Sequence, residues 1–237
     1  RELTNVTMTI RRSETCLPQG MGRGFNPKLA AAEVLQLLAG KADPEWMTKA
    51  SPKYLEFTGG AMTGAYGPRL ADQMPFIIQT LRDDPMSRQA VATIWDPQKD
   101  LAQVHGDRPC TVYISFMIRR GALITSTYMR SQDVYLGLTY DLVMFGQLHQ
   151  TVASILDVEP GDHVHAVQSM HLYERDIEKA ANITMPPMWP IDTLYGLDAE
   201  SWAEVQHLAY SIAYDTDFAD ETFTEAWLRK YSEDARS

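Results

Sequence analysis

The chain has 237 residues, of which 45% are hydrophobic and 22% charged, and its formal net charge at pH 7 is −10. This length and apolar content suffice for one large core, so we expect a single domain over residues 1–237. A pI near 5.0 argues against polymeric nucleic acid as a partner, because its binders neutralise phosphates with a basic face. No apolar run approaches the roughly 20 residues that cross a bilayer, so no membrane partner is expected. Nothing at the start resembles a secretory signal, which favours the cytoplasm.

Helix and strand signals alternate through the first half of the chain. Residues 27–38 combine strong helix formers with a proline near the start, and Gly40 is a stop signal. Three later runs are rich in β-branched and aromatic residues and predict strands of one sheet: 91–95, 111–118 and 122–128.

The second half begins with a long apolar segment, 138–156, which predicts a buried helix. Residues 160–162 predict a turn, and a strand is expected to follow it as far as His171. The order of elements favours an α+β fold. After Asp176 the pattern changes, and residues 176–237 are expected to form a divergent helical segment at the periphery. Its acidic amphipathic helices are expected over 199–214 and 221–231.

Cys110 is one of only two cysteines, with Cys16, too few for a disulfide framework. Taken alone, Cys110 has the ordinary interpretation of a buried, inert core cysteine. Downstream, however, Arg130 and two acids interrupt a segment that otherwise reads as a strand end and a buried helix start. Charges there are costly unless they meet a ligand or form an internal ion pair of Arg130 with Asp133 or Asp141.

Three segments carry a resemblance when they are taken together. They are RPCTVYISF from Arg108, YMRSQDVYLGLTYD from Tyr128 and PGDHVHAVQSMHLY from Pro160. Their order and spacing resemble the thymidylate synthase superfamily, which has a PC nucleophile, an RS-x-D-x-x-LG-x-x-x-(N or D) segment and a late H-x-Y. The segments around Glu33, Tyr66 and Arg88 are also similar, so the resemblance covers residues 1–173. It implies a thymidylate-synthase-like fold, a mixed β-sheet packed by helices.

The resemblance also implies roles for a nucleophile and for a phosphate site. Cys110 would add to carbon 6 of a pyrimidine nucleoside monophosphate, and nearby arginines would favour its thiolate. Arg130 and Ser131 would bind the phosphate. Arg88 would be donated by a second subunit, with Arg1 completing the cluster, so a homodimer is expected.

Further site residues follow from the same resemblance. Glu33 would organise proton transfers, and Tyr66 would belong to the network that removes the carbon 5 proton. His171 and Tyr173 would bind the sugar hydroxyl. The remaining substrate-binding positions of the central motif would be Asp133 and Gly137. From residue type alone, Glu33 could instead be a solvated helix residue, and His171 and Tyr173 ordinary strand residues.

His163 and His165 alternate along the expected strand, a pattern that could suggest a metal. Two such histidines without a carboxylate or cysteine partner are more often structural. We therefore assign no metal.

Asp141 occupies the position that decides the base. Enzymes of this superfamily that act on uracil carry an asparagine there, since an amide both accepts from ring nitrogen 3 and donates to the carbonyl oxygen. A carboxylate instead accepts from the amino group of cytosine and from a protonated ring nitrogen. The resemblance implies a cytidylate 5-hydroxymethylase that uses 5,10-methylenetetrahydrofolate as co-substrate and water as the final nucleophile.

Departures from the superfamily pattern leave alternatives open. Thr111 follows the nucleophile in place of a histidine, and Gln89 replaces the second arginine of a pair. The alternatives are a thymidylate synthase, a deoxyuridylate hydroxymethylase and a non-catalytic nucleotide-binding relative. Arg88 and Ser131 together slightly favour dCMP over CMP.

Overall fold

The computed structural model describes residues 1–11, 15–18, 24–58, 60, 62–102, 107–183, 188–191 and 199–215. Within them a mixed sheet of order β1-β7-β5-β4-β3 forms the centre, with β6 beside β7. Its strands are β1 (Glu2–Ile10), β3 (Val91–Thr93), β4 (Thr111–Arg119), β5 (Ala122–Met129), β6 (Gln132–Asp133) and β7 (Glu159–His171). Strand β7 runs parallel to β5 and β6 and antiparallel to β1.

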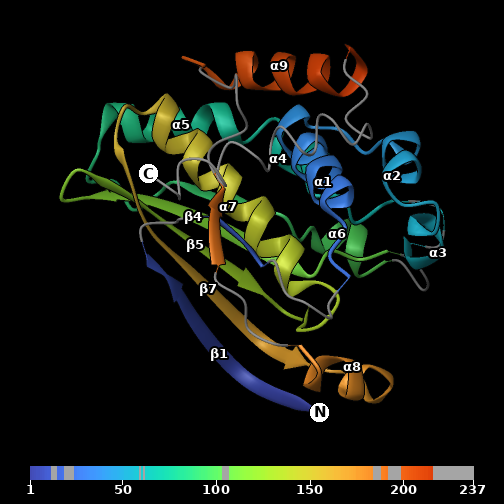
Figure 1. Cartoon of the computed structure of the whole chain (residues 1–237). Coiled ribbons are helices and arrows are strands. Elements are labelled where there is room, and N and C mark those ends of the chain that lie inside the picture. The colour runs from blue at the N-terminus through green and yellow to red at the C-terminus, as the bar shows by residue number, and fades with distance from the viewer. Residues whose placement is uncertain are drawn as a thin grey trace, which may run out of the picture.

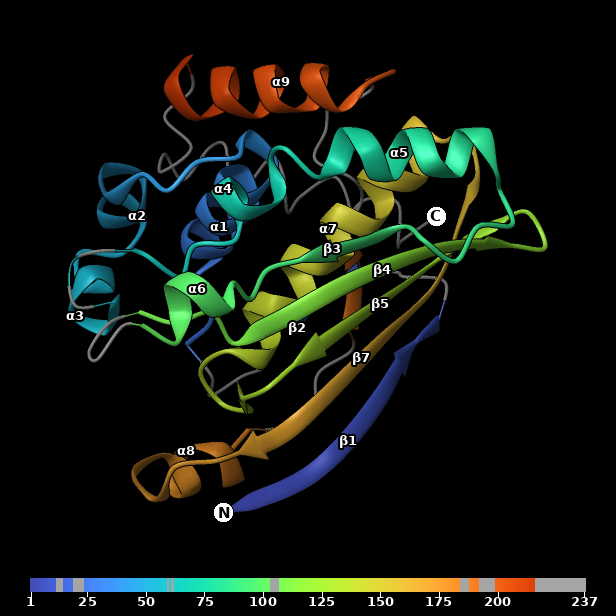
Figure 2. The same ribbon diagram turned by 180° about the vertical axis from the view of Figure 1, so that it is seen from behind.

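Helices cover one face of this sheet, and the opposite face is turned toward the viewer in Figure 2 without a described helix over it. The helices are α1 (Pro27–Ala39), α2 (Pro44–Ala50), α3 (Tyr54–Thr58), α4 (Gly67–Leu70), α5 (Met74–Asp83), α6 (Pro97–Asp100), α7 (Leu138–Ile155), α8 (Ile177–Ala181) and α9 (Trp202–Asp215). Figure 1 shows α7 lying across the sheet with α1 beside it. Both helices are buried along most of their length, so they form the core with the inner face of the strands.

The predicted helix at 27–38 is confirmed as α1. The side chain of Asn26 caps it by accepting from the N–H of Leu29, Pro27 starts it, and Gly40 ends it with φ 68°. The strands predicted at 91–95, 111–118 and 122–128 and the helix at 138–156 are also confirmed, with ends shifted by two residues at most. The prediction of an α+β fold is therefore confirmed.

The turn predicted at residues 160–162 is wrong, because these residues lie inside β7. A Cβ atom on Gly161 would lie 2.4 Å from the carbonyl oxygen of Leu123. The glycine thus permits close approach of β7 to β5, where the register shifts between Leu123 and Thr125. Strand β1, which pairs with β7 over most of its length, was not predicted.

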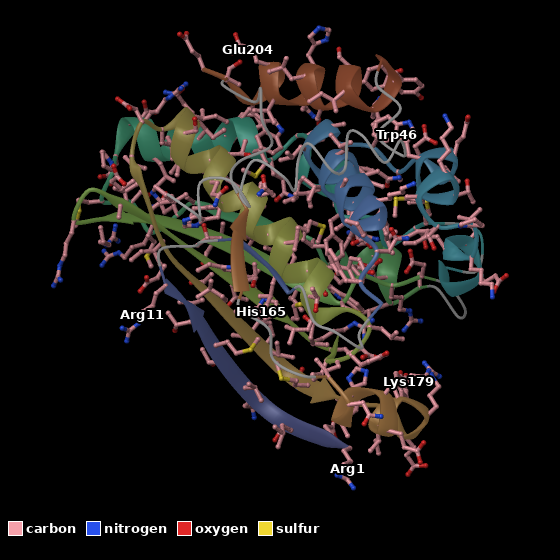
Figure 3. All side chains as sticks on the ribbon, in the orientation of Figure 1. Arg1, Arg11, Trp46, His165, Lys179 and Glu204 are labelled. Atoms are coloured by element: carbon pink, nitrogen blue, oxygen red, sulfur yellow. The ribbon has the colours of Figure 1, made fainter. Side chains whose placement is uncertain are left out.

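The segment after Asp176 is helical at α8 and α9, and α9 lies at the outer edge of the molecule (Figure 1) with one face buried. Its apolar residues Trp202, Val205, Ala209 and Ala213 are buried, and it packs on α1 and α5. Trp46 of α2 lies below it (Figure 3), with ring centres 6.1 Å from Tyr210 and 5.3 Å from Tyr214. The segment also contains β8 (Met188–Ile191), which pairs with β2 (Thr15–Pro18). The helix predicted at 221–231 lies outside the described residues.

Across the part of the chain described here, no helix combines the length and the apolar character that spanning a membrane would need.

Candidate active site

Cys110 and Arg130 meet where two neighbouring strands have their ends. Cys110 directly precedes β4 and Arg130 directly follows β5, and the Arg130 N–H donates to the Cys110 carbonyl at 2.9 Å. The Arg130 guanidinium also donates to the carbonyl oxygens of Pro109 at 3.0 Å and Arg108 at 3.2 Å. It therefore lies over the segment that carries the thiol. Its other neighbour is the ring of Trp95, at 5.5 Å.

The alternative of an internal ion pair is wrong. Among the described residues, Arg130 forms no salt bridge with Asp133 or Asp141. Asp141 instead accepts a hydrogen bond from the Gln132 side chain at 2.7 Å. Among the described residues the guanidinium therefore has no carboxylate partner, which suits an anion site.

Glu33 of α1 and Asp141 in the first turn of α7 are two partly buried carboxyl groups close enough for their charges to interact. Burial, and after it the nearby Asp141 charge, raise the pKa of Glu33 from 4.5 to about 8. Burial also raises the pKa of Asp141 from 3.8 to about 6, although the bond from Gln132 opposes this. At pH 7, Glu33 therefore keeps its proton while Asp141 is ionised. The interpretation of Glu33 as a solvated helix residue is wrong.

Cys110 is a half-buried free thiol within the electrostatic range of Asp141 and Asp107. Burial raises its pKa above the ordinary 9.0, Arg130 lowers it, and the charges of Asp141 and Asp107 raise it again. Arg130 lowers the pKa of Cys110 as expected of a nearby arginine, but the net pKa is raised. The reason is that desolvation of the anion outweighs one nearby cation.

Tyr66 connects the start of α4 to the Cys110 segment. Its hydroxyl accepts a hydrogen bond from the Thr111 N–H at 3.3 Å, and its ring stacks on Phe145 at 6.0 Å. Burial raises its pKa well above 10.0, with further increases from the charges of Asp141 and Cys110. The phenol therefore keeps its proton, and the fold brings it to the thiol.

The expected phosphate ligands fall into two groups. Ser131 follows Arg130 directly, beside Cys110. Arg88 is exposed and precedes β3, where Ala90 accepts from the Phe116 N–H. That position is roughly 25 Å along β4 from Cys110, at about 3.3 Å per residue. Within one chain Arg88 does not reach the site, so its role stays a prediction that needs a second subunit.

Arg1, at the free end of β1 in Figure 3, lies beside the end of β7. Its terminal ammonium donates to the Leu172 carbonyl at 2.8 Å. The rings of His171 and Tyr173 meet edge to face at 5.1 Å. Arg1, His171 and Tyr173 thus gather at one corner of the sheet, and their roles in phosphate and sugar binding stay predictions.

Asp133 and Gly137 shape the turn into α7. One oxygen of Asp133 accepts from the N–H groups of Tyr135 and Leu136 at 2.8 Å each. The other oxygen is buried and has no hydrogen-bond partner among the described residues, so it is available to a ligand. A Cβ atom on Gly137 would lie 3.0 Å from the Gln132 amide nitrogen and 3.4 Å from Asp141 Oδ2. Gly137 therefore leaves room for the bond between those two side chains.

Gln132 is the residue that the sequence analysis missed. Its side chain bridges Asp141 and His165, and His165 continues through Thr127 to His163. The signal for it was the row of polar residues on inward-facing strand positions, where apolar residues are usual. In the part of the chain described, the two histidines serve this hydrogen-bond chain, and no group of three or more metal-ligating side chains comes together.

This fold, with a cysteine at a strand end beside an arginine and a pair of buried acids, corresponds to one family. A model of the family described as "Thymidylate synthase" matches residues 4–194. The chain belongs to the thymidylate synthase family.

Two relatives carry a more specific name. Over 199 residues the chain is 31% identical to a deoxyuridylate hydroxymethyltransferase of Bacillus phage SP01, a match covering 76% of this chain and 50% of the relative. Over 168 residues it is 31% identical to a protein of the same name from Pseudomonas phage M6, covering 67% and 48%. The chain spans about half the length of these relatives.

Proposed function

We propose that the chain is a 5-hydroxymethylase of cytidine or deoxycytidine monophosphate. The observation that carries the proposal is an aspartate in the first turn of α7, Asp141, whose Oδ2 accepts a hydrogen bond from the Gln132 amide at 2.7 Å. Burial raises its pKa only to about 6, which favours the ionised form at pH 7. An ionised carboxylate accepts from the 4-amino group of cytosine and from a protonated nitrogen 3. Uracil would present its carbonyl oxygen to the same carboxylate with no proton between them, which is unfavourable in a desolvated site.

The first step is addition of Cys110 sulfur to carbon 6 of the base. Its thiol proton is lost, a C–S bond forms, and the electron pair of the 5,6 double bond moves toward carbon 5 and the ring. Asp141 stabilises the protonated nitrogen 3 that draws these electrons. Because burial raises the thiol pKa, binding of the substrate has to assist the loss of the proton. Arg130 is the cation placed to favour the anion.

Carbon 5 then gains a one-carbon unit and loses its proton. In this family, 5,10-methylenetetrahydrofolate supplies that unit at the oxidation level of formaldehyde. The free oxygen of Asp133 offers a buried acceptor to an N–H group of a bound heterocycle. Protonated Glu33 and Tyr66 can donate and relay protons at the ring. The bond between the transferred carbon and the folate nitrogen then breaks, so tetrahydrofolate leaves and an exocyclic methylene remains on carbon 5. Water adds to this methylene carbon and Cys110 leaves, so the product carries a hydroxymethyl group and no reductant is consumed.

Deoxyuridylate hydroxymethylation is the second candidate. It is favoured by the names of the two relatives. Because the pKa of Asp141 is about 6, a fraction of the molecules carries a protonated Asp141 near neutral pH. The protonated form donates a hydrogen bond, as an amide does. The residues that would distinguish ribose from deoxyribose are those at the corner of the sheet that contains His171 and Tyr173. We also propose a homodimer, supported by the face of the sheet that no described helix covers (Figure 2).

The experiment is product analysis by mass spectrometry after incubation with methylenetetrahydrofolate and an equimolar mixture of CMP, dCMP, UMP and dUMP. We expect hydroxymethylated cytidylate, formed by the wild type and by Cys16→Ala, and lost in Cys110→Ala. Hydroxymethylated dUMP as the main product would establish the second candidate and contradict our interpretation of Asp141. Methylated dUMP would indicate a thymidylate synthase, and nucleotide binding without any product would indicate a non-catalytic relative.

A further inference from the structure

Four buried side chains extend from Asp141 along the face of the sheet that α7 covers, where Phe145 contacts both His163 and His165. Gln132 Nε2 lies 2.7 Å from Asp141 Oδ2, and Gln132 Oε1 lies 3.0 Å from His165 Nε2. His165 Nδ1 lies 2.7 Å from Thr127 Oγ1, which lies 3.1 Å from His163 Nε2. Gln132, Thr127, His163 and His165 are each at most 2% exposed. Figure 3 marks His165 on β7, within the interior of the fold.

The direction of every bond in this chain follows from Asp141. An ionised carboxylate only accepts, so Gln132 turns its NH2 group to Asp141 and its oxygen to His165. His165 must then donate from Nε2 and accept at Nδ1 from the Thr127 hydroxyl. Thr127 in turn accepts from His163 Nε2.

Both histidines suit this one-way arrangement because each carries a single N–H. Burial lowers the pKa of His163 to about 3 and that of His165 to about 4, so both rings are neutral at pH 7. A reversed chain would turn the Gln132 oxygen toward Asp141, and Asp141 would then have to carry a proton. The orientation of Gln132 and the ionisation of Asp141 are therefore coupled.

We propose that Gln132 is a positioning residue that sets the choice of base: held by His165 and Thr127, it keeps an N–H on Asp141, so that this carboxylate meets the substrate as an acceptor. The inference rests on the proposed function, because it explains how a cytosine preference is maintained. Gln132 acts through Asp141. Loss of its donor, or of the histidine that orients it, favours protonated Asp141, which can donate to the carbonyl oxygen of uracil.

The test measures the ratio of cytidylate to uridylate product when both substrates compete in one tube, so the fraction of folded enzyme cancels. Gln132→Glu keeps the shape but places two carboxyl groups together that must share a proton, and we expect the ratio to fall at least about tenfold. His165→Phe removes the orienting bond, and its ratio should fall in the same direction. The matched control is His149→Phe, because His149 is an equally buried histidine whose bond goes to Thr125, at 2.8 Å.

The outcomes separate the two proposals. A wild type that modifies only uridylate overturns the proposed function and this inference with it. A wild type that prefers cytidylate, with the ratio unchanged in Gln132→Glu, overturns the role of Gln132 alone. An equal fall in His149→Phe and His165→Phe also overturns it, because general loosening of the core would then be the cause. If Gln132→Glu does not fold, the comparison of the two histidine variants decides.

Discussion

Asp100 is fully buried and Asp141 is partly buried, and the two carboxylates have different hydrogen-bond partners. Asp100, at the end of α6, accepts two hydrogen bonds of 2.7 Å from the Arg69 guanidinium and one from the Asp96 N–H. The bonds from Arg69 hold its pKa below the ordinary 3.8. Asp141 has one amide donor and no cation, and burial raises its pKa to about 6.

The difference shows where this fold contains a charged group whose hydrogen bonds are incomplete. The region of Asp100 uses a complete ion pair to tie α4 to α6 and to the end of β3. The region of Asp141 leaves a carboxylate with unused hydrogen-bonding capacity, at a desolvation cost that only a ligand offsets. Perturbed carboxyl groups of this kind gather at functional sites more often than at structural ones.

The largest expected effect comes from Asp141→Asn. Cytidylate kcat/KM should fall at least about 10³-fold, because the amide cannot accept twice from the protonated cytosine ring, and uridylate turnover should rise. Stability at pH 7 should be retained, since the substitution removes an unpaired buried charge. Steady-state kinetics with both nucleotides and a thermal melt check this. Unchanged cytidylate turnover would mean that Asp141 does not read the base.

The next largest effect is expected from Asp100→Asn, which should change stability and leave the choice of substrate unchanged. Breaking this buried pair should lower the free energy of unfolding by about 3 kcal/mol, while the product ratio of the folded enzyme stays unchanged. Urea denaturation measures the first and the competition assay the second. Asp96→Asn serves as the control, because Asp96 is partly exposed and its ion pair with Lys99 lies at the surface. A changed product ratio would contradict the structural role of Asp100.

The smallest effect is a pH dependence of stability. The folded pKa of Glu33, about 8, lies above its ordinary 4.5, so the folded state holds this proton more tightly than the unfolded chain. The stability from Glu33 is full below pH 4.5 and is lost as pH rises through 8. Between pH 6.5 and 8 the contribution of Glu33 to the free energy of unfolding should fall by roughly 2 kcal/mol. The buried histidines contribute with the opposite sign near pH 6.5, because the unfolded chain still releases their protons there, so the effect of Glu33 is the difference between the wild type and Glu33→Gln.

Glu33→Gln should flatten that slope, as followed by denaturation midpoints from pH 6.5 to 8. Glu45→Gln, on an exposed turn of α2, should leave it unchanged. Equal slopes in the wild type and Glu33→Gln would show that Glu33 is ionised throughout. Asp100 contributes to the pH dependence of stability with the opposite sign, because its folded pKa is lowered. The stability that Asp100 gives the protein is present at neutral pH and is lost only as the solution becomes acidic.

Much of the site was accessible from the sequence because its motifs are local. Cys110 is predicted before a strand, and Arg130 and Asp141 belong to one segment that passes from a strand through a turn into a helix. The series of hydrogen bonds that links Gln132 to His163 could not be predicted from the sequence. Its residues come from β5, β6 and β7 and meet only when those strands pair. For the same reason Gly161 was interpreted as a turn residue, although its role is close contact with Leu123.

The sequence by itself determined the order and type of the main elements, from the capped α1 to the apolar α7, and singled out Cys110, Arg130 and Asp141 as candidate site residues. Periodicity, caps and motif spacing are local properties, so they survive in the linear chain. Only the tertiary structure decided the protonation states: the raised pKa values of Cys110 and Glu33 and the coupling of Gln132 to Asp141. These depend on desolvation and on neighbours from distant segments, which exist only once the chain has folded.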